Sequence, residues 1–251
     1  MNLNDKIQKV RFCVEKKKKD YPYEWLGRSL AYNNYPPRDV LPLLASKKKD
    51  RYKIICEILD QDDDFLLTSQ GYENARVDAL CIDTKEYKLN PNMEIISSIR
   101  RYVSIPLLQK GFIIDEYQLL EAVVYGADFV QLIAKILTKK ELKDLLSFAR
   151  RLGLEAMVDV ANKEDLTKAI FAGASIIGIN HRNLDDLSLD LNLSQNLIPI
   201  VPNGKIIIAH GGIDNKEIIE DLSQMGVDGF LLDGYFKEDK MLVIKNLKEK
   251  S

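Results

Sequence analysis

Eight short apolar runs, rich in β-branched residues, alternate with longer amphipathic stretches from about residue 52 onward. This rhythm is typical of repeated strand and helix units that build a parallel sheet. The predicted strands are Ile54–Leu59, Ala79–Asp83, Pro106–Lys110, Phe129–Ile133, Ala156–Val160, Ile176–Asn180, Ile206–Ala209 and Gly229–Leu232. Because several runs are almost wholly apolar, both faces of the sheet are expected to be covered. Eight units favour a closed α/β barrel, the (β/α)8 or TIM barrel, over an open sheet.

The segments between these strands carry helix signals. Several predicted helices are followed directly by a glycine, which can adopt the left-handed conformation that ends a helix. These helices are Asp115–Tyr125, Lys139–Leu152, Lys163–Ala172 and Asn215–Met225, and the glycines are Gly126, Gly153, Gly173 and Gly226.

The first fifty residues lack this rhythm. They begin with a predicted helix over Leu3–Lys18 and are too short for an independent core of much stability. We therefore expect residues 1–251 to form a single barrel domain, with residues 1–50 as an N-terminal helical extension packed on it. The length of 251 residues suits one such barrel.

Composition narrows the function classes. No run of about 18 apolar residues is present, and the N-terminus lacks the apolar stretch of a signal peptide, so we expect a cytoplasmic protein without a membrane partner. The formal net charge of −2 provides no basic field for nucleic acid. The short basic runs Lys16–Lys19 and Lys47–Lys49 are interpreted as solvated faces.

Cys13, Cys56 and Cys81 have no metal-site spacing and are interpreted as buried free thiols.

Polar residues end most of the apolar strands, where barrels of this kind carry their catalytic groups. The strand-end residues are Glu57, Asp83, Lys110, Lys135, Asp159, Asn180, His210 and Asp233. A lysine that ends an apolar strand requires a carboxylate partner or a chemical role. Lys110 and Asp159 are therefore either an acid–base pair across a cavity or a structural salt bridge, and the sequence leaves both open.

Several stretches resemble the indole-3-glycerol-phosphate synthase family. They are Trp25–Leu30, Pro36–Val40, Leu107–Gln118, Glu121–Asp128 and Gly178–Leu184. The resemblance covers nearly the whole chain, including the extension. It implies a carboxy-lyase of tryptophan biosynthesis that decarboxylates and cyclises 1-(2-carboxyphenylamino)-1-deoxyribulose 5-phosphate, a phosphorylated small molecule, without a cofactor or a metal.

The same resemblance assigns roles to individual residues. Lys110 stands where the family has the general acid that protonates the leaving hydroxyl. Glu57, Asn180 and Arg182 match a glutamate, an asparagine and an arginine of the family site, and Phe112 matches an aromatic residue that packs on the substrate.

The chain departs from the family pattern at catalytic positions. Leu59 replaces a lysine that contacts the substrate carboxylate, and Gln61 and Asp62–Asp64 follow it in a polar loop over Asp60–Asp64. Asp159 replaces the glutamate that serves as general base and is one methylene shorter. His210 replaces a second glutamate, either merely filling its space or acting as a new base near neutral pH.

The phosphate site departs as well. Gly211 replaces a serine, and Asp233 introduces a carboxylate, which repels a phosphate dianion. The backbone amides of Gly211, Gly212 and Gly234 remain able to bind phosphate. In the fourth strand, Gln131 occupies an inward position that is apolar in the family.

These departures leave three hypotheses. The first is a working synthase with Lys110 as acid and Asp159 as base, and with Glu57, Asn180 and His210 orienting the intermediate. The alternative is a degenerate or repurposed paralogue that lacks synthase activity, as a non-catalytic binding protein or an enzyme with another ligand. The third is that the open end of the barrel binds a less anionic ligand or a divalent metal. No metal-ligand spacing in the sequence supports a metal strongly.

Overall fold

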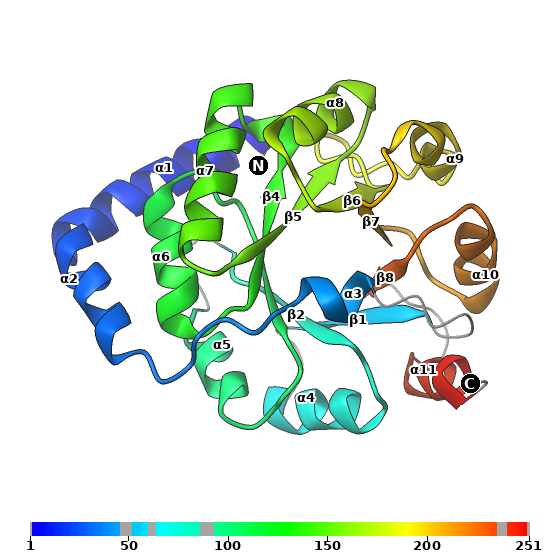
Figure 1. Cartoon of the computed structure of the whole chain (residues 1–251), viewed down its shortest axis with the longest axis horizontal. Helices are drawn as coiled ribbons and strands as arrows, with labels where there is room; N and C mark the ends of the chain where they lie inside the picture. The colour runs from blue at the N-terminus through cyan, green and yellow to red at the C-terminus, as the bar shows by residue number, and fades with distance from the viewer. Residues whose placement is uncertain (1, 46–51, 60–63, 86–92, 235–239, 250–251) are drawn as a thin grey trace.

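The computed structural model describes residues 2–45, 52–59, 64–85, 93–234 and 240–249. Within these residues, eight parallel strands form one closed barrel in the order β1 to β8, and helices surround it (Figure 1). The strands are β1 Lys53–Ile58, β2 Ala79–Asp83, β3 Leu107–Lys110, β4 Phe129–Ile133, β5 Glu155–Val160, β6 Ile176–Asn180, β7 Ile206–His210 and β8 Gly229–Leu232. The predicted (β/α)8 barrel is confirmed.

The strand bounds agree with the sequence prediction to within one residue at each end. The prediction ended the seventh strand at Ala209. In the structure β7 includes His210, which pairs with Asn180 of β6. This pairing fixes the backbone of His210 at the C-terminal edge of the barrel.

The α-helices of the described residues belong to the extension, connect the strands or, in the case of α11, follow the last strand. They are α1 Leu3–Asp20, α2 Tyr23–Ser29, α3 Leu41–Ala45, α4 Phe65–Asn74, α5 Met93–Arg100, α6 Glu116–Tyr125, α7 Lys139–Arg151, α8 Lys163–Ala172, α9 Leu193–Leu197, α10 Lys216–Gln224 and α11 Lys240–Glu249. Helices α6 and α8 end at Gly126 and Gly173, whose φ angles of 92° and 86° are left-handed as predicted. Gly153 and Gly226 are left-handed as well.

The barrel interior is apolar towards the N-terminal ends of the strands and polar at their C-terminal ends. Phe129, Met157 and Ile208 point inward and form one buried cluster with Val40 and Leu44 of the extension. Because this cluster includes residues from the starts of several strands, Val40 and Leu44 close the N-terminal end of the barrel. The opposite end stays open for function.

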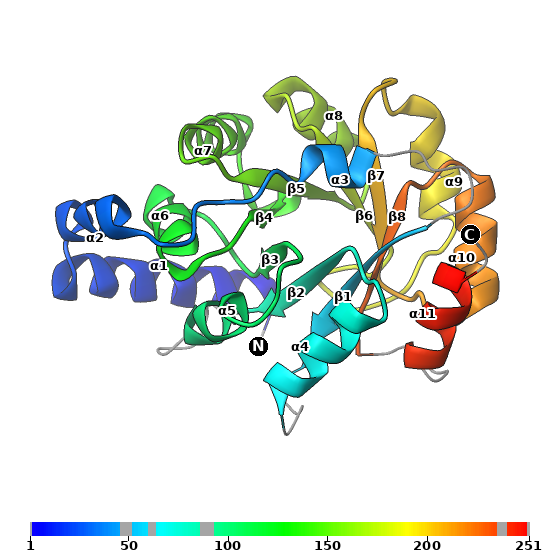
Figure 2. The ribbon, with the colours of Figure 1, turned by 60° about the horizontal axis from the view of Figure 1, so that its bottom comes forward.

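The extension lies along the outside of the barrel, with α1 and α2 beside α6 in both views (Figures 1 and 2). Lys17 Nζ lies 2.8 Å from Glu121 Oε2, and the Tyr117 hydroxyl donates to the Tyr21 carbonyl at 3.0 Å. These contacts support a single domain over residues 1–251. The single domain stays a prediction. Among the described residues, no helix is both long and apolar enough to cross a membrane.

Candidate functional site

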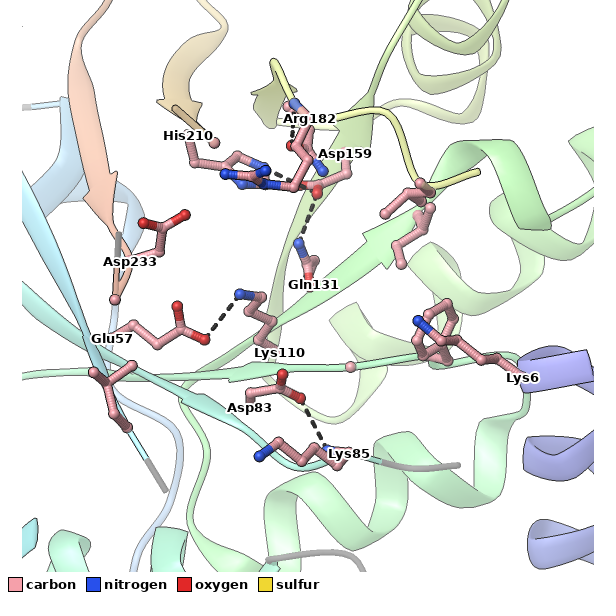
Figure 3. A pocket seen from close by; sticks show the side chains of 18 of the residues that line it. Lys6, Glu57, Asp83, Lys85, Lys110, Gln131, Asp159, Arg182, His210 and Asp233 are labelled. Carbon is pink, nitrogen blue, oxygen red and sulfur yellow. Dashed lines mark hydrogen bonds and ion pairs between the residues drawn. The ribbon is translucent and has the colours of Figure 1, made fainter. Parts of the chain in front are cut away.

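A cavity of about 540 Å³ opens at the C-terminal ends of the strands (Figure 3). Most of the residues that the sequence placed in the site line this cavity. These are Glu57, Lys110, Phe112, Asp159, Asn180, Arg182, His210, Gly211 and Gly234. They converge because alternate side chains of each strand point into the barrel. Asp159 is thus two residues beyond Met157 of the inner apolar cluster, and His210 is two beyond Ile208.

Lys110 forms an ion pair with Glu57, whose Oε1 lies 2.9 Å from Lys110 Nζ. Burial lowers the pKa of Lys110, but the charge and hydrogen bond of Glu57, together with the charge of Asp83, outweigh it, and the pKa is raised above its usual value. The ammonium therefore stays protonated at neutral pH. The sequence offered Asp159 as the partner of Lys110; the ion pair in the structure is with Glu57.

Asp159 instead belongs to a cluster on the other side of the cavity. Gln131 Nε2 donates to Asp159 Oδ2 at 2.6 Å, and His210 Nε2 lies 2.9 Å from the same oxygen. Asp159 and His210 are both buried. Gln131, which occupies an inward position of the fourth strand that is apolar in the family, thus holds the Asp159 carboxylate.

Asn180, Arg182 and Gly211 build the adjoining wall. Asn180 Oδ1 accepts a hydrogen bond from the Arg182 amide at 3.0 Å. A Cβ on Gly211 would lie 2.8 Å from Asn180 Oδ1, and its φ of 77° is left-handed, so only glycine fits there. Gly212, in contrast, is absent from the described lining residues and packs against Leu189. The predicted role of Gly212 in substrate binding requires a place at the cavity wall. The structure does not bring Gly212 there.

The structure also adds cations that sequence reasoning missed. Lys6 of α1 lines the cavity, with its Nζ 5.9 Å from the centre of the Phe112 ring. Lys85 lines it two residues after the strand-end Asp83, whose Oδ1 accepts from the Lys85 amide at 3.0 Å. Proximity to a strand end was a usable signal for Lys85. No local signal marks Lys6, because only packing of the extension brings it there.

Two other predicted features are placed elsewhere. Lys135, assigned to a strand end, lies in a 3-10 turn over Ala134–Ile136 and pairs with Asp185 outside the described lining. His181, given no role, is buried, with its Nε2 2.7 Å from Ser194 Oγ. Burial, followed by the charge of His210, lowers the pKa of His181 to about 4. His181 is therefore neutral at physiological pH.

The candidate metal ligands of the described residues do not gather in one cluster. No group of three or more His, Cys, Asp or Glu side chains among them is arranged to hold a metal ion. Residues 60–63 of the predicted polar loop, and the basic run Lys47–Lys49, lie outside the described residues, whereas Asp64 caps α4. The cysteines are free and buried as predicted, and burial raises the pKa of Cys56 to about 12.

Comparison with known proteins assigns a family to this arrangement. The family model described as indole-3-glycerol phosphate synthase matches residues 5–244. An indole-3-glycerol phosphate synthase from Campylobacter curvus is 47% identical, over 99% of this chain and 100% of that protein. One from Campylobacter jejuni is 50% identical, over 96% of each chain. One from Sulfurimonas denitrificans is 45% identical, over 99% of this chain and 98% of that protein.

Solved structures show the same fold at low sequence identity. An N-acetylmannosamine-6-phosphate 2-epimerase from Clostridium perfringens superposes with a TM-score of 0.61 at 13% identity, covering 82% of this chain and 93% of that chain. This likeness concerns the barrel alone. The full-length relatives and the family model carry the assignment: the chain belongs to the indole-3-glycerol-phosphate synthase family.

Proposed function

We propose that this chain is an indole-3-glycerol-phosphate synthase, a carboxy-lyase of tryptophan biosynthesis. It converts 1-(2-carboxyphenylamino)-1-deoxyribulose 5-phosphate to indole-3-glycerol phosphate, carbon dioxide and water. The observation that carries the proposal is the partly buried Lys110–Glu57 ion pair facing Asp159 in one cavity. Family membership supports the same reaction.

In this reaction Lys110 is the general acid. Its raised pKa keeps the ammonium protonated at neutral pH, ready to protonate the hydroxyl that leaves as water. Glu57 holds the ammonium at the cavity wall. Asp159 is the general base, and Asn180 and His210 orient the intermediate between acid and base.

Substrate binding uses the remaining lining residues. Phe112 packs on the aromatic ring of the substrate, and Arg182 supplies a positive charge for the anionic groups. Gly211 and Gly234 line the cavity, and their backbone amides suit the phosphate. Lys6 and Lys85 add positive charge at the rim, which offsets the carboxylate of Asp233.

The proposal includes no cofactor and no nucleic-acid or membrane partner, and it places the reaction in the cytoplasm. The enzyme family acts on a phosphorylated small molecule. Such a substrate is in keeping with a cavity whose polar side chains include several cations.

The test is product formation by purified protein, followed by indole fluorescence. The matched control for Lys110→Ala is Lys140→Ala, because Lys140 is 87% exposed on α7. We expect turnover by the parent and by Lys140→Ala, and a loss of at least about 100-fold in Lys110→Ala. No product from the parent protein at high enzyme concentration would contradict the proposed function.

A further inference from the structure

Asp159 and His210 face each other across β6, which lies between their strands in the barrel. A Cβ on Gly178 of β6 would lie only 2.4 Å from Asp159 Oδ1, so the glycine leaves room for the carboxylate. Asp159 Oδ2 then lies 2.9 Å from His210 Nε2 (Figure 3). The close approach therefore depends on a small residue in the intervening strand.

Two atoms of this pair have no well-aligned hydrogen-bond partner among the described residues. They are Asp159 Oδ1 and His210 Nε2, and both are buried. His210 Nε2 is near enough to Asp159 Oδ2 for an ion pair, but its direction is not that of a hydrogen bond. Unpaired buried polar atoms are costly, and here they lie on residues that line the substrate cavity.

On the basis of the proposed function, we propose that Asp159 and His210 act together as the general base, taking up one proton as a coupled pair. His210 is then a catalytic residue of this chain and not only an orienting one. A carboxylate alone is a weak base at neutral pH, whereas an imidazole beside a carboxylate exchanges a proton near neutrality.

The proton is taken up in the elimination of water. The C–O bond of the dihydroindole intermediate breaks, and Lys110 gives its proton to the departing hydroxyl. The electron pair of the neighbouring ring C–H bond forms the C=C bond of the indole. The C–H proton passes to the Asp159 carboxylate and is held between Asp159 Oδ2 and His210 Nε2 as an imidazolium–carboxylate pair. After product release the pair returns a proton to solvent, and Lys110 regains one.

The charges around His210 suit this role. The Asp159 carboxylate lies beside His210 Nε2, and the positive charge of Lys110 is already matched by Glu57. The other ionisable groups near His210 or in the cavity lining include His181, Arg182, Asp233, Asp83, Lys85 and Lys6. His181 is neutral in the relevant pH range because its pKa is about 4.

The test is the pH dependence of kcat for the parent and His210→Gln. We expect kcat at neutral pH to fall by about 10- to 100-fold, with little change in KM. The acid limb of the profile should move to lower pH, because the base is then Asp159 alone. His181→Gln, which replaces the chain's only other histidine, should leave the acid limb in place.

A second measurement does not depend on turnover. Titration of the His210 ring, followed by NMR in the parent and in Asp159→Asn, should show a lower midpoint in the variant. An unchanged acid limb in His210→Gln, or an unchanged His210 midpoint in Asp159→Asn, would overturn the coupled pair. These results leave the proposed function intact if the parent forms product, whereas a parent without product refutes that function itself.

Discussion

Lys110 Nζ and Glu57 Oε1 lie 2.9 Å apart although β2 separates their strands. The two side chains meet above Cys81, which pairs with Glu57 on one side and with Leu108 on the other. Burial and then the charge of Glu57 raise the pKa of the Cys81 thiol well above its usual value. The thiol therefore stays neutral and does not compete for the Lys110 ammonium.

Replacing Glu57 with Gln should make Lys110 a stronger acid. In the parent, burial lowers the pKa of Lys110, and the charge of Glu57 is the largest of the effects that together raise it. Without that charge the balance shifts towards burial, so the pKa falls and Lys110 loses its proton at lower pH. We expect the alkaline limb of kcat/KM against pH to move down by about one unit or more. The control is Glu164→Gln, because Glu164 is exposed. An alkaline limb that does not move in Glu57→Gln would argue against the Lys110–Glu57 ion pair.

Replacing Leu59 with Lys should restore a cation at the cavity wall. Leu59 lines the cavity beside Gly234, where a Cβ would lie 3.0 Å from the Leu59 side chain. Because charge-assisted hydrogen bonds are strong, we expect kcat/KM to rise about tenfold. Leu59→Met adds similar length without charge and should give no gain. Steady-state kinetics that rank both variants alike would count against a role for charge at this position.

Replacing Asp128 with Asn should destabilise the fold without changing the chemistry. Asp128 is fully buried and accepts hydrogen bonds from the Arg38 amide at 2.6 Å and from Arg100 Nη1 at 2.7 Å. Removing this charge leaves Arg100 buried without its partner and should cost about 3–5 kcal/mol. Urea unfolding measures the loss against the exposed Asp144→Asn. A reduced kcat of the folded variant would show that Asp128 also affects the site.

His181 should make stability depend on pH. Its folded-state pKa of about 4 lies below the unfolded value, so the unfolded chain binds more protons between these values. The stabilisation is complete above about pH 6.5 and is lost as pH falls towards 4, by about 3 kcal/mol. Guanidinium unfolding at pH 7.5 and 4.5 should show a smaller fall in His181→Gln than in the parent. Equal falls would contradict the assignment.

The sequence by itself determined the barrel and the direction of its functional groups. Apolar runs and the glycines that end helices are local features of the sequence. Strand bounds were therefore predictable to about one residue. The alternation of side chains along a strand also follows from local geometry. Their positions at the C-terminal ends of predicted strands placed Lys110, Asp159 and His210 at one end of the barrel before their neighbours were known.

Only the tertiary structure decided which of these groups meet. Lys110 pairs with Glu57, 53 residues away in sequence, and Asp159 with His210, because the strand order of the barrel brings together the ends of strands separated by one other strand. Lys6 reaches the cavity only because α1 packs along α6. Contacts between distant segments depend on how strands and helices pack in three dimensions, and no local pattern in the sequence encodes those distances.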